Sequence, residues 1–184
     1  MKPISSIHAG EYLVGTFIEE NYKTFNVWLP SKDTGIDLLV TNKTNSKTVS
    51  LQVKFSKDFL GSLGNSLSEV VATKVKSGGW WTFNTEKIRS SCADLWILVL
   101  YRFSRRDYDL LVIEPANLLR RYEQLNRTGR IQSYVWVTAS GKCWETRGLN
   151  KKKQIELAND DLVDSARDLS AYLNNWRVLE MKLA

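Results

Sequence analysis

The sequence has few of the residues on which the best-known hydrolase sites depend. It contains one histidine, His8, and two cysteines, Cys92 and Cys143, among 184 residues. Zinc hydrolases need several histidine or cysteine ligands, and serine or cysteine hydrolases need a histidine base with partners, so the sequence argues against both classes. Two cysteines make neither a disulfide framework nor a zinc cluster, and we expect two reduced thiols in a cytoplasmic protein.

Other common signals are also absent. Neither a GxxxxGK[ST] nor a GxGxxG phosphate-binding loop occurs. The longest apolar run, residues 93–101, is too short to cross a bilayer and is interrupted by Asp94, and the first twelve residues lack the apolar segment of a signal peptide. We therefore expect no membrane association, and we expect any catalysis to use carboxylates, lysine and a hard metal ion.

The composition is that of a folded protein with a basic surface. The apolar fraction is 43%, and the length suits a single domain spanning residues 1–184. The net charge is +6, and residues 74–153 hold 16 basic against 7 acidic residues, whereas residues 154–184 hold 3 against 6. A basic centre is compatible with a polyanionic partner such as DNA, and a solvated basic surface is the alternative.

The hydrophobic pattern predicts alternating helices and strands, and therefore an α/β fold. A helix is expected at 7–21, capped by Ser5 or Ser6, and a loop at 59–68. Expected strands are 24–29, 35–41, 49–56, 70–76, 94–103, 108–114, 131–138 and 142–147. Further helices are expected at 85–91, at 116–124 after Pro115, and at 160–176 with Asn159 as its cap.

The stretch from Gly35 to Ser56 organises this pattern. It reads as two strands joined by a polar turn, with Asp37 opening the first strand. In the second strand apolar residues alternate with polar ones, so that Gln52 and Lys54 point the same way, about 6.5 to 7 Å apart along the strand. A tight hairpin would bring Asp37 beside them.

Glu11 falls on the apolar stripe of the first predicted helix, between Ile7 and Val14. A carboxylate on an apolar face is unfavourable unless something compensates it. One interpretation is that Glu11 reaches water or a lysine at the edge of the stripe. The other is that Glu11 faces inward to a metal site, and the Asp37 hairpin favours this second interpretation.

The set Glu11, Asp37 and Gln52-Val53-Lys54 resembles the PD-(D/E)xK nuclease superfamily, with Gln52 in place of the second acid. The resemblance covers about the first third of the chain. It implies a restriction-endonuclease-like mixed β-sheet flanked by helices, and a Mg²⁺-dependent DNA endonuclease in which Mn²⁺ can substitute. Glu11, Asp37, Gln52 and the Val53 carbonyl would hold the ion, and Lys54 would serve the attacking water.

Several alternatives remain open at this stage. Gln52 carries no charge, so the protein could be a catalytically inactive nucleic-acid-binding module of the same fold. An interaction or toxin-system protein that acts on RNA or protein is a third possibility. Cutting both strands of a duplex usually requires two active sites, so a homodimer is an alternative to a monomer.

Arginines and tryptophans are candidates for contacts with nucleic acid. The arginines considered for phosphate contacts are Arg89, Arg102, Arg105, Arg106, Arg120 and Arg121. Trp80 and Trp81 follow two glycines and could stack on bases, although the seven tryptophans of a single domain are expected to lie mostly in the core.

Overall fold

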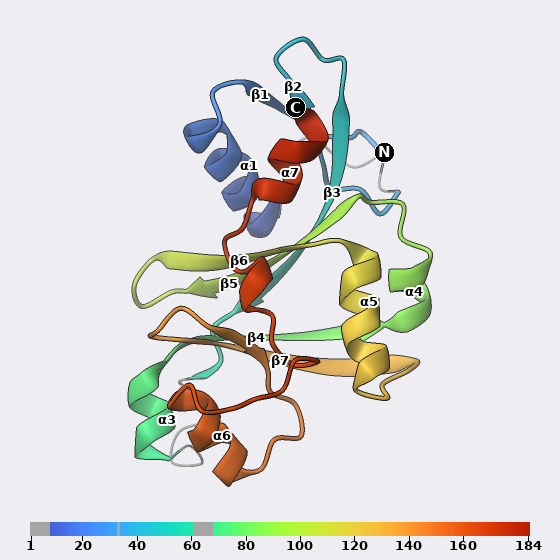
Figure 1. Ribbon diagram of the computed structural model, residues 1–184. Helices are drawn as coiled ribbons and strands as arrows, with labels where there is room; N and C mark the ends of the chain where they lie inside the picture. The colour runs from blue at the N-terminus through green and yellow to red at the C-terminus, as the bar shows by residue number, and fades with distance from the viewer. Residues whose placement is uncertain (1–7, 33, 61–67) are drawn as a thin grey trace.

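The protein is a mixed α/β structure, as the sequence predicts. The computed structural model describes residues 8–32, 34–60 and 68–184 (Figure 1). Its elements are α1 (Ala9–Asn21), β1 (Phe25–Trp28), β2 (Leu38–Asn42), β3 (Thr48–Lys57), α3 (Glu69–Lys74), β4 (Val75–Asn84), α4 (Thr85–Arg89), β5 (Leu95–Arg102), β6 (Asp107–Ile113), α5 (Pro115–Gln124), β7 (Arg130–Thr138), β8 (Cys143–Glu145), α6 (Lys151–Ala158), the 3-10 helix η2 (Ser170–Tyr172) and α7 (Arg177–Leu183). Within the described ranges, none of the helices is long and apolar enough to cross a membrane.

The larger sheet has the strand order β1-β2-β3-β5-β6. The first three strands form an antiparallel meander, β5 runs parallel to β3, and β6 returns antiparallel to β5. The predicted hairpins at 35–56 and 94–114 are therefore confirmed. The parallel pairing of β3 with β5 is possible because α3, β4 and α4 lie between them in sequence and supply the long crossover that parallel strands require.

The smaller sheet, β4-β7-β8, is antiparallel and lies against one face of the larger sheet (Figure 1). Buried side chains of both sheets and of α4 and α5 form one apolar cluster between them. Helices α1 and α7 cover the other face of the larger sheet, and α3 and α6 cover part of the outer face of the smaller one. The chain is therefore layered as helices, sheet, sheet and helices.

Strand β3 contributes side chains to two of these layers. Val49, Leu51 and Val53 pack in the cluster beneath α1 and α7. Gln52 and Lys54 alternate with them and project toward the smaller sheet, where both line a cleft with Trp81 and Phe83. The predicted period-two pattern of this strand is confirmed.

Two of the expected signals for helix starts, those at Asn84 and Pro115, are confirmed. The Asn84 side chain caps α4 by accepting hydrogen bonds from the N–H groups of Glu86 and Lys87. Pro115 occupies the first turn of α5, and the hairpin of β7 and β8 forms as expected. Helix α1 begins at Ala9, whereas Ser5, Ser6 and most of the expected loop at 59–68 lie outside the described residues.

The predicted strand at 70–76 is wrong over most of its length. Residues 69–74 form helix α3, and β4 begins only at Val75. Ser68 caps the helix by accepting a hydrogen bond from the N–H of Val71, and Val71 is fully buried beneath it. The β-branched residues of this segment suggested a strand. The Ser68 cap and the buried Val71 side chain instead favour a short helix of six residues.

The predicted helix at 160–176 is also wrong. Asn159 ends α6 instead of starting a helix, and Asp160 has a left-handed backbone with φ of 64°. The leucines that suggested a helical stripe pack in different places, because Leu162 joins the α3–α6 cluster and Leu169 joins the cluster between the sheets. The helical spacing of these leucines therefore does not correspond to one apolar face of a helix.

Candidate functional site

A cleft of about 510 Å³ opens beside the start of β2 and the middle of β3. It is lined by His8, Ala9, Gly10, Glu11, Asp37, Gln52, Val53, Lys54 and Phe55. All of the site residues expected from the sequence are in this set, although they come from a helix, a strand start and a strand interior. The cleft gathers two carboxylates, an amide and an ammonium group at one place.

Asp37 lies immediately before β2, at the point where β2 stops pairing with β3. Its backbone N–H donates to the Leu51 carbonyl at 2.8 Å, and its carboxylate Oδ2 accepts a hydrogen bond of 2.8 Å from the backbone N–H of Val53. The N–H and C=O of one residue in a strand point to the same side. The Val53 carbonyl therefore also points toward the Asp37 side of β3, beyond the last paired residue, Leu38.

Glu11 reaches the cleft because α1 lies very close to β3. Its side chain is in the first turn of α1, and the residue is 5% exposed. A Cβ atom at Gly10 would lie 3.0 Å from the Cβ of Phe55 and 3.2 Å from Cγ1 of Val53. The missing side chain at Gly10 thus permits the close approach that carries Glu11 into the cleft.

Gln52 and Lys54 enter the cleft from the face of β3 that is turned away from α1. Both also line a second cleft of about 480 Å³, between β3 and β4, with Trp81, Phe83 and Trp96 among its walls. The Lys54 Nζ lies 5.5 Å from the centre of the Trp96 ring. Glu11 and Lys54 nevertheless share one cleft, because β2 no longer covers this edge of β3.

Strand β4 holds the backbone of β3 beside these residues. The Trp81 indole N–H donates to the Lys54 carbonyl at 3.2 Å, and the Trp80 N–H donates to the Ser56 hydroxyl at 2.9 Å. Trp81 is buried, whereas Trp80 is 46% exposed. The backbone that carries Lys54 is therefore tied to both sheets.

The donor set of the first cleft suits a hard cation. Glu11 and Asp37 offer carboxylate oxygens, Gln52 offers an amide oxygen, and Val53 offers a backbone carbonyl, which are the ligand types that Mg²⁺ accepts. In the part of the chain that the structure describes, no group of three or more His, Cys, Asp or Glu side chains is placed to hold a metal ion. Any ion here would depend on neutral oxygens for part of its coordination.

Two neighbours of the site were not expected from the sequence. Trp96 lies beside Gln52 because β3 and β5 pair in parallel with these residues in register. Such a distant pairing leaves no local signal. Gly10 is different, because a glycine directly before a carboxylate on a helix is visible in the sequence and marks a close approach of the backbone.

The arginines considered for phosphate contacts have different surroundings. Arg102 is 3% exposed and is bound by Asp107 and Asp109, so the idea that it contacts phosphate is wrong. Arg89 pairs with Glu123, and Arg121 lies against the Tyr172 ring. The remaining three side chains, those of Arg105, Arg106 and Arg120, are exposed.

Comparison with protein-family models finds no match, and neither curated proteins nor solved structures give a significant match. The similarity to the PD-(D/E)xK superfamily therefore depends on the residues of the first cleft and stays a prediction.

Proposed function

We propose that the protein is a Mg²⁺-dependent endonuclease that hydrolyses phosphodiester bonds in DNA. The observation that carries the proposal is the single cleft lined by Glu11, Asp37, Gln52 and Lys54. The carboxylate oxygens could hold a metal ion, and the ammonium group could offset the charge of the phosphate, and both would assist phosphodiester hydrolysis.

Each residue has a distinct role in this proposal. Glu11, Asp37, the Gln52 amide oxygen and the Val53 carbonyl would hold Mg²⁺, with Mn²⁺ as a substitute. The bound ion would polarise the phosphate ester. The Lys54 ammonium would orient the attacking water or offset charge on the phosphate, and the Trp96 ring lies within cation–π distance of it.

DNA is the proposed polyanion because of the charge distribution of the chain. The central part of the sequence has the basic excess, and it forms the smaller sheet with β5, β6 and their helices. Contacts between basic side chains and phosphates supply most of the sequence-independent affinity of proteins for DNA. Binding should therefore weaken steeply as salt increases.

The direct test is nicking of a supercoiled plasmid in the presence of Mg²⁺ or Mn²⁺. Lys54→Ala should reduce the cleavage rate by about 100-fold or more while DNA binding persists. Lys57→Ala is the matched control, because Lys57 is an exposed lysine of the same strand and should cut at the wild-type rate. Failure of the wild-type protein to cut plasmid, linear duplex or single-stranded DNA with either metal would overturn the proposal.

A second function is favoured by one observation, the neutral Gln52. With only Glu11 and Asp37 as acidic ligands, the cleft could bind nucleic acid without a metal and without catalysis. Calorimetry separates the two functions. Salt-sensitive DNA binding without heat of Mg²⁺ binding at millimolar concentration would identify a non-catalytic DNA-binding protein.

A further inference from the structure

A row of polar and aromatic side chains crosses the outer face of the smaller sheet. Three cross-strand pairs of β4 and β7 lie on this face, namely Trp80 with Tyr134, Thr82 with Gln132, and Asn84 with Arg130. All six residues are exposed or half-buried, because their sequence neighbours on each strand face the core between the sheets. From Trp80 to Asn84 the row extends about 13 Å along the strand.

The row ends at a basic hollow of about 360 Å³. Its walls are Arg127, Arg130, Ile131, Gln132 and Arg147. Within the described parts of the chain, neither Arg130 nor Arg147 has a carboxylate at salt-bridge distance. These two guanidinium groups are therefore uncompensated positive charges at the rim of one hollow.

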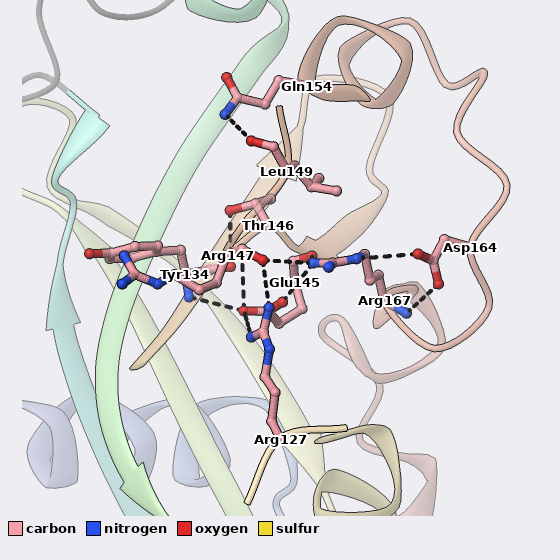
Figure 2. Close-up of polar contacts among 9 residues, drawn as sticks. All are labelled: Arg127, Tyr134, Glu145, Thr146, Arg147, Leu149, Gln154, Asp164 and Arg167. Carbon is pink, nitrogen blue, oxygen red and sulfur yellow. Dashed lines mark hydrogen bonds and ion pairs between the residues drawn. The ribbon is translucent and has the colours of Figure 1, made fainter. Parts of the chain in front are cut away.

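Arg127, one wall of this hollow, is paired with the buried Glu145, as Figure 2 shows. The buried Glu145 carboxylate lies 2.8 Å from Nη1 of Arg127 and 3.0 Å from Nη1 of Arg167. Arg127 also donates to the Arg147 backbone carbonyl. Arg127 therefore positions the backbone of Arg147. The charge of Arg127 is largely compensated by Glu145.

Aromatic rings border the hollow on the Trp80 side. The Arg147 guanidinium lies over the Tyr134 ring, 5.0 Å from its centre, as Figure 2 shows. The ring centres of Tyr134 and Trp80 are 6.4 Å apart, and Trp80 is 46% exposed. An exposed indole, a neighbouring phenol and a stacked guanidinium thus form one surface with the basic hollow.

The row of side chains borders the second cleft, which shares Gln52 and Lys54 with the candidate catalytic cleft. The second cleft is shared by Gln52, Lys54, Thr82 and Asn84. Thr82 and Asn84 are in turn the cross-strand partners of Gln132 and Arg130. A chain lying along the row could therefore lead from the arginine hollow to the neighbourhood of Lys54.

We propose that the surface formed by Trp80, Tyr134, Gln132, Arg130 and Arg147, here named the Trp80–Arg147 surface, binds single-stranded DNA. Bases stack on the exposed Trp80 ring, and phosphates lie on Arg130 and Arg147. A single strand fits better than a duplex, because only unpaired bases offer a free ring face for stacking. The surface uses none of the proposed metal ligands, so this inference goes beyond the proposed nuclease function and stands without it.

The test measures fluorescence anisotropy of a labelled thymidine oligonucleotide about 16 nucleotides long, without metal. Trp80→Ala should weaken binding by about 5- to 150-fold, which is the range for loss of one stacked base. Trp28→Ala is the matched control, because Trp28 is 50% exposed but lies in β1 at the edge of the other sheet. It should bind as tightly as the wild type.

Salt dependence tests the two arginines. Combined Arg130→Ala and Arg147→Ala should lower the slope of log affinity against log salt by about 1.4, as expected for two lost phosphate contacts to a single strand. The control is Lys43→Ala with Arg177→Ala, two exposed basic residues of the β2–β3 turn and of α7 that lie outside the basic central part, and it should leave the slope unchanged.

The outcomes distinguish this inference from the nuclease proposal. Asp37→Asn should bind the oligonucleotide like the wild type, so failure to cut DNA leaves the inference intact. Unchanged affinity in Trp80→Ala, in a variant whose circular dichroism matches the wild type, would overturn it. Tighter binding to duplex DNA, with the same affinity in Trp80→Ala, would overturn it as well.

Discussion

The carboxylate of Asp37 accepts a hydrogen bond of 2.8 Å from the backbone N–H of Val53. Asp37 lies just before β2 begins, and this bond takes the place of a backbone partner from β2. The Val53 carbonyl points toward the same side of β3 as its N–H. One side chain thus supports the sheet edge and also lines the candidate metal site. The two roles can be separated by mutation.

Asp37→Asn should keep the hydrogen bond, since an amide oxygen still accepts, but should abolish cleavage because the charge is lost. Asp37→Ala should abolish cleavage and also lower the free energy of unfolding by about 1 kcal/mol or more, because the Val53 N–H loses its partner. Urea denaturation and plasmid nicking measure the two effects. Full cleavage by Asp37→Asn would remove Asp37 from the proposed metal site.

Gln52→Glu restores the acid that the resemblance leads one to expect. A third carboxylate in the cleft should raise the affinity for Mg²⁺ and shift half-maximal cleavage to lower Mg²⁺ concentration. Isothermal titration with Mg²⁺ and a nicking assay over a metal series measure this. Gln124→Glu, at the exposed end of α5, is the control for a general charge effect. An unchanged metal dependence would contradict a role for Gln52 as a ligand.

The two glycines of α1 provide a matched pair. At Gly15 a Cβ would lie 3.7 Å from Cγ1 of Val27, an ordinary contact, so Gly15→Ala should stabilise the protein by up to about 1 kcal/mol. At Gly10 a Cβ would lie 3.0 Å from Phe55, so Gly10→Ala should gain less stability or none. It should also slow cleavage, since α1 must shift and carry Glu11 with it. Equal stability and equal cleavage in both variants would contradict this packing argument.

Stability should also depend on a buried charge cluster around Arg102. The Asp109 carboxylate lies 2.6 Å from Nη1 of Arg102 and 2.9 Å from Nζ of Lys76. The side chains of Asp109 and Arg102 are buried, and that of Lys76 is partly exposed. Asp109→Ala should lower the free energy of unfolding at pH 7 by about 3 to 5 kcal/mol, because it leaves a buried guanidinium without its main partner. Asp107→Ala, which removes a more exposed partner of Arg102, should have a smaller effect in the same urea denaturation experiment.

The same cluster predicts how stability changes with pH. Burial raises the pKa of Asp109, whereas hydrogen bonds from Lys76 and Arg102 lower it. The combined lowering is larger than the effect of burial, so the pKa lies below its ordinary value. A carboxyl with a lowered folded-state pKa contributes stability above its unfolded pKa, about 3.9, and that stability is lost as the pH falls through the folded-state pKa. Wild-type stability should therefore fall below about pH 4. Asp109→Asn should show a flatter decline, and an identical acid profile would exclude Asp109 as a contributor.

Local patterns predicted the parts of the fold that local interactions determine. Three features could be predicted because each depends on residues that are close in sequence. They are the alternation of side chains in β3, the Asn84 cap of α4 and the proline in the first turn of α5. The stretch 160–176 was misread because Leu162 and Leu169 belong to different clusters, which spacing cannot distinguish.

The candidate site shows the same division. Glu11, Asp37, Gln52 and Lys54 were identifiable as a group because their residue types and order form a pattern. Trp96 was not, since it meets Gln52 only through a parallel pairing across more than forty residues. The Trp80–Arg147 surface was hidden for the same reason, because its two strands are brought together by the register of β4 and β7.

The alternation of side chains along β4 determines which tryptophans a fluorescence quencher can reach. Two indoles that are adjacent in the chain face opposite environments, Trp80 toward solvent and Trp81 toward the core. The other shielded indoles are those of Trp96, Trp136, Trp144 and Trp176, whereas Trp28 is open. Collisional quenchers such as iodide should therefore extinguish only the emission of Trp28 and Trp80 while the protein is intact, and the protected remainder of the emission reports whether the interior is still closed.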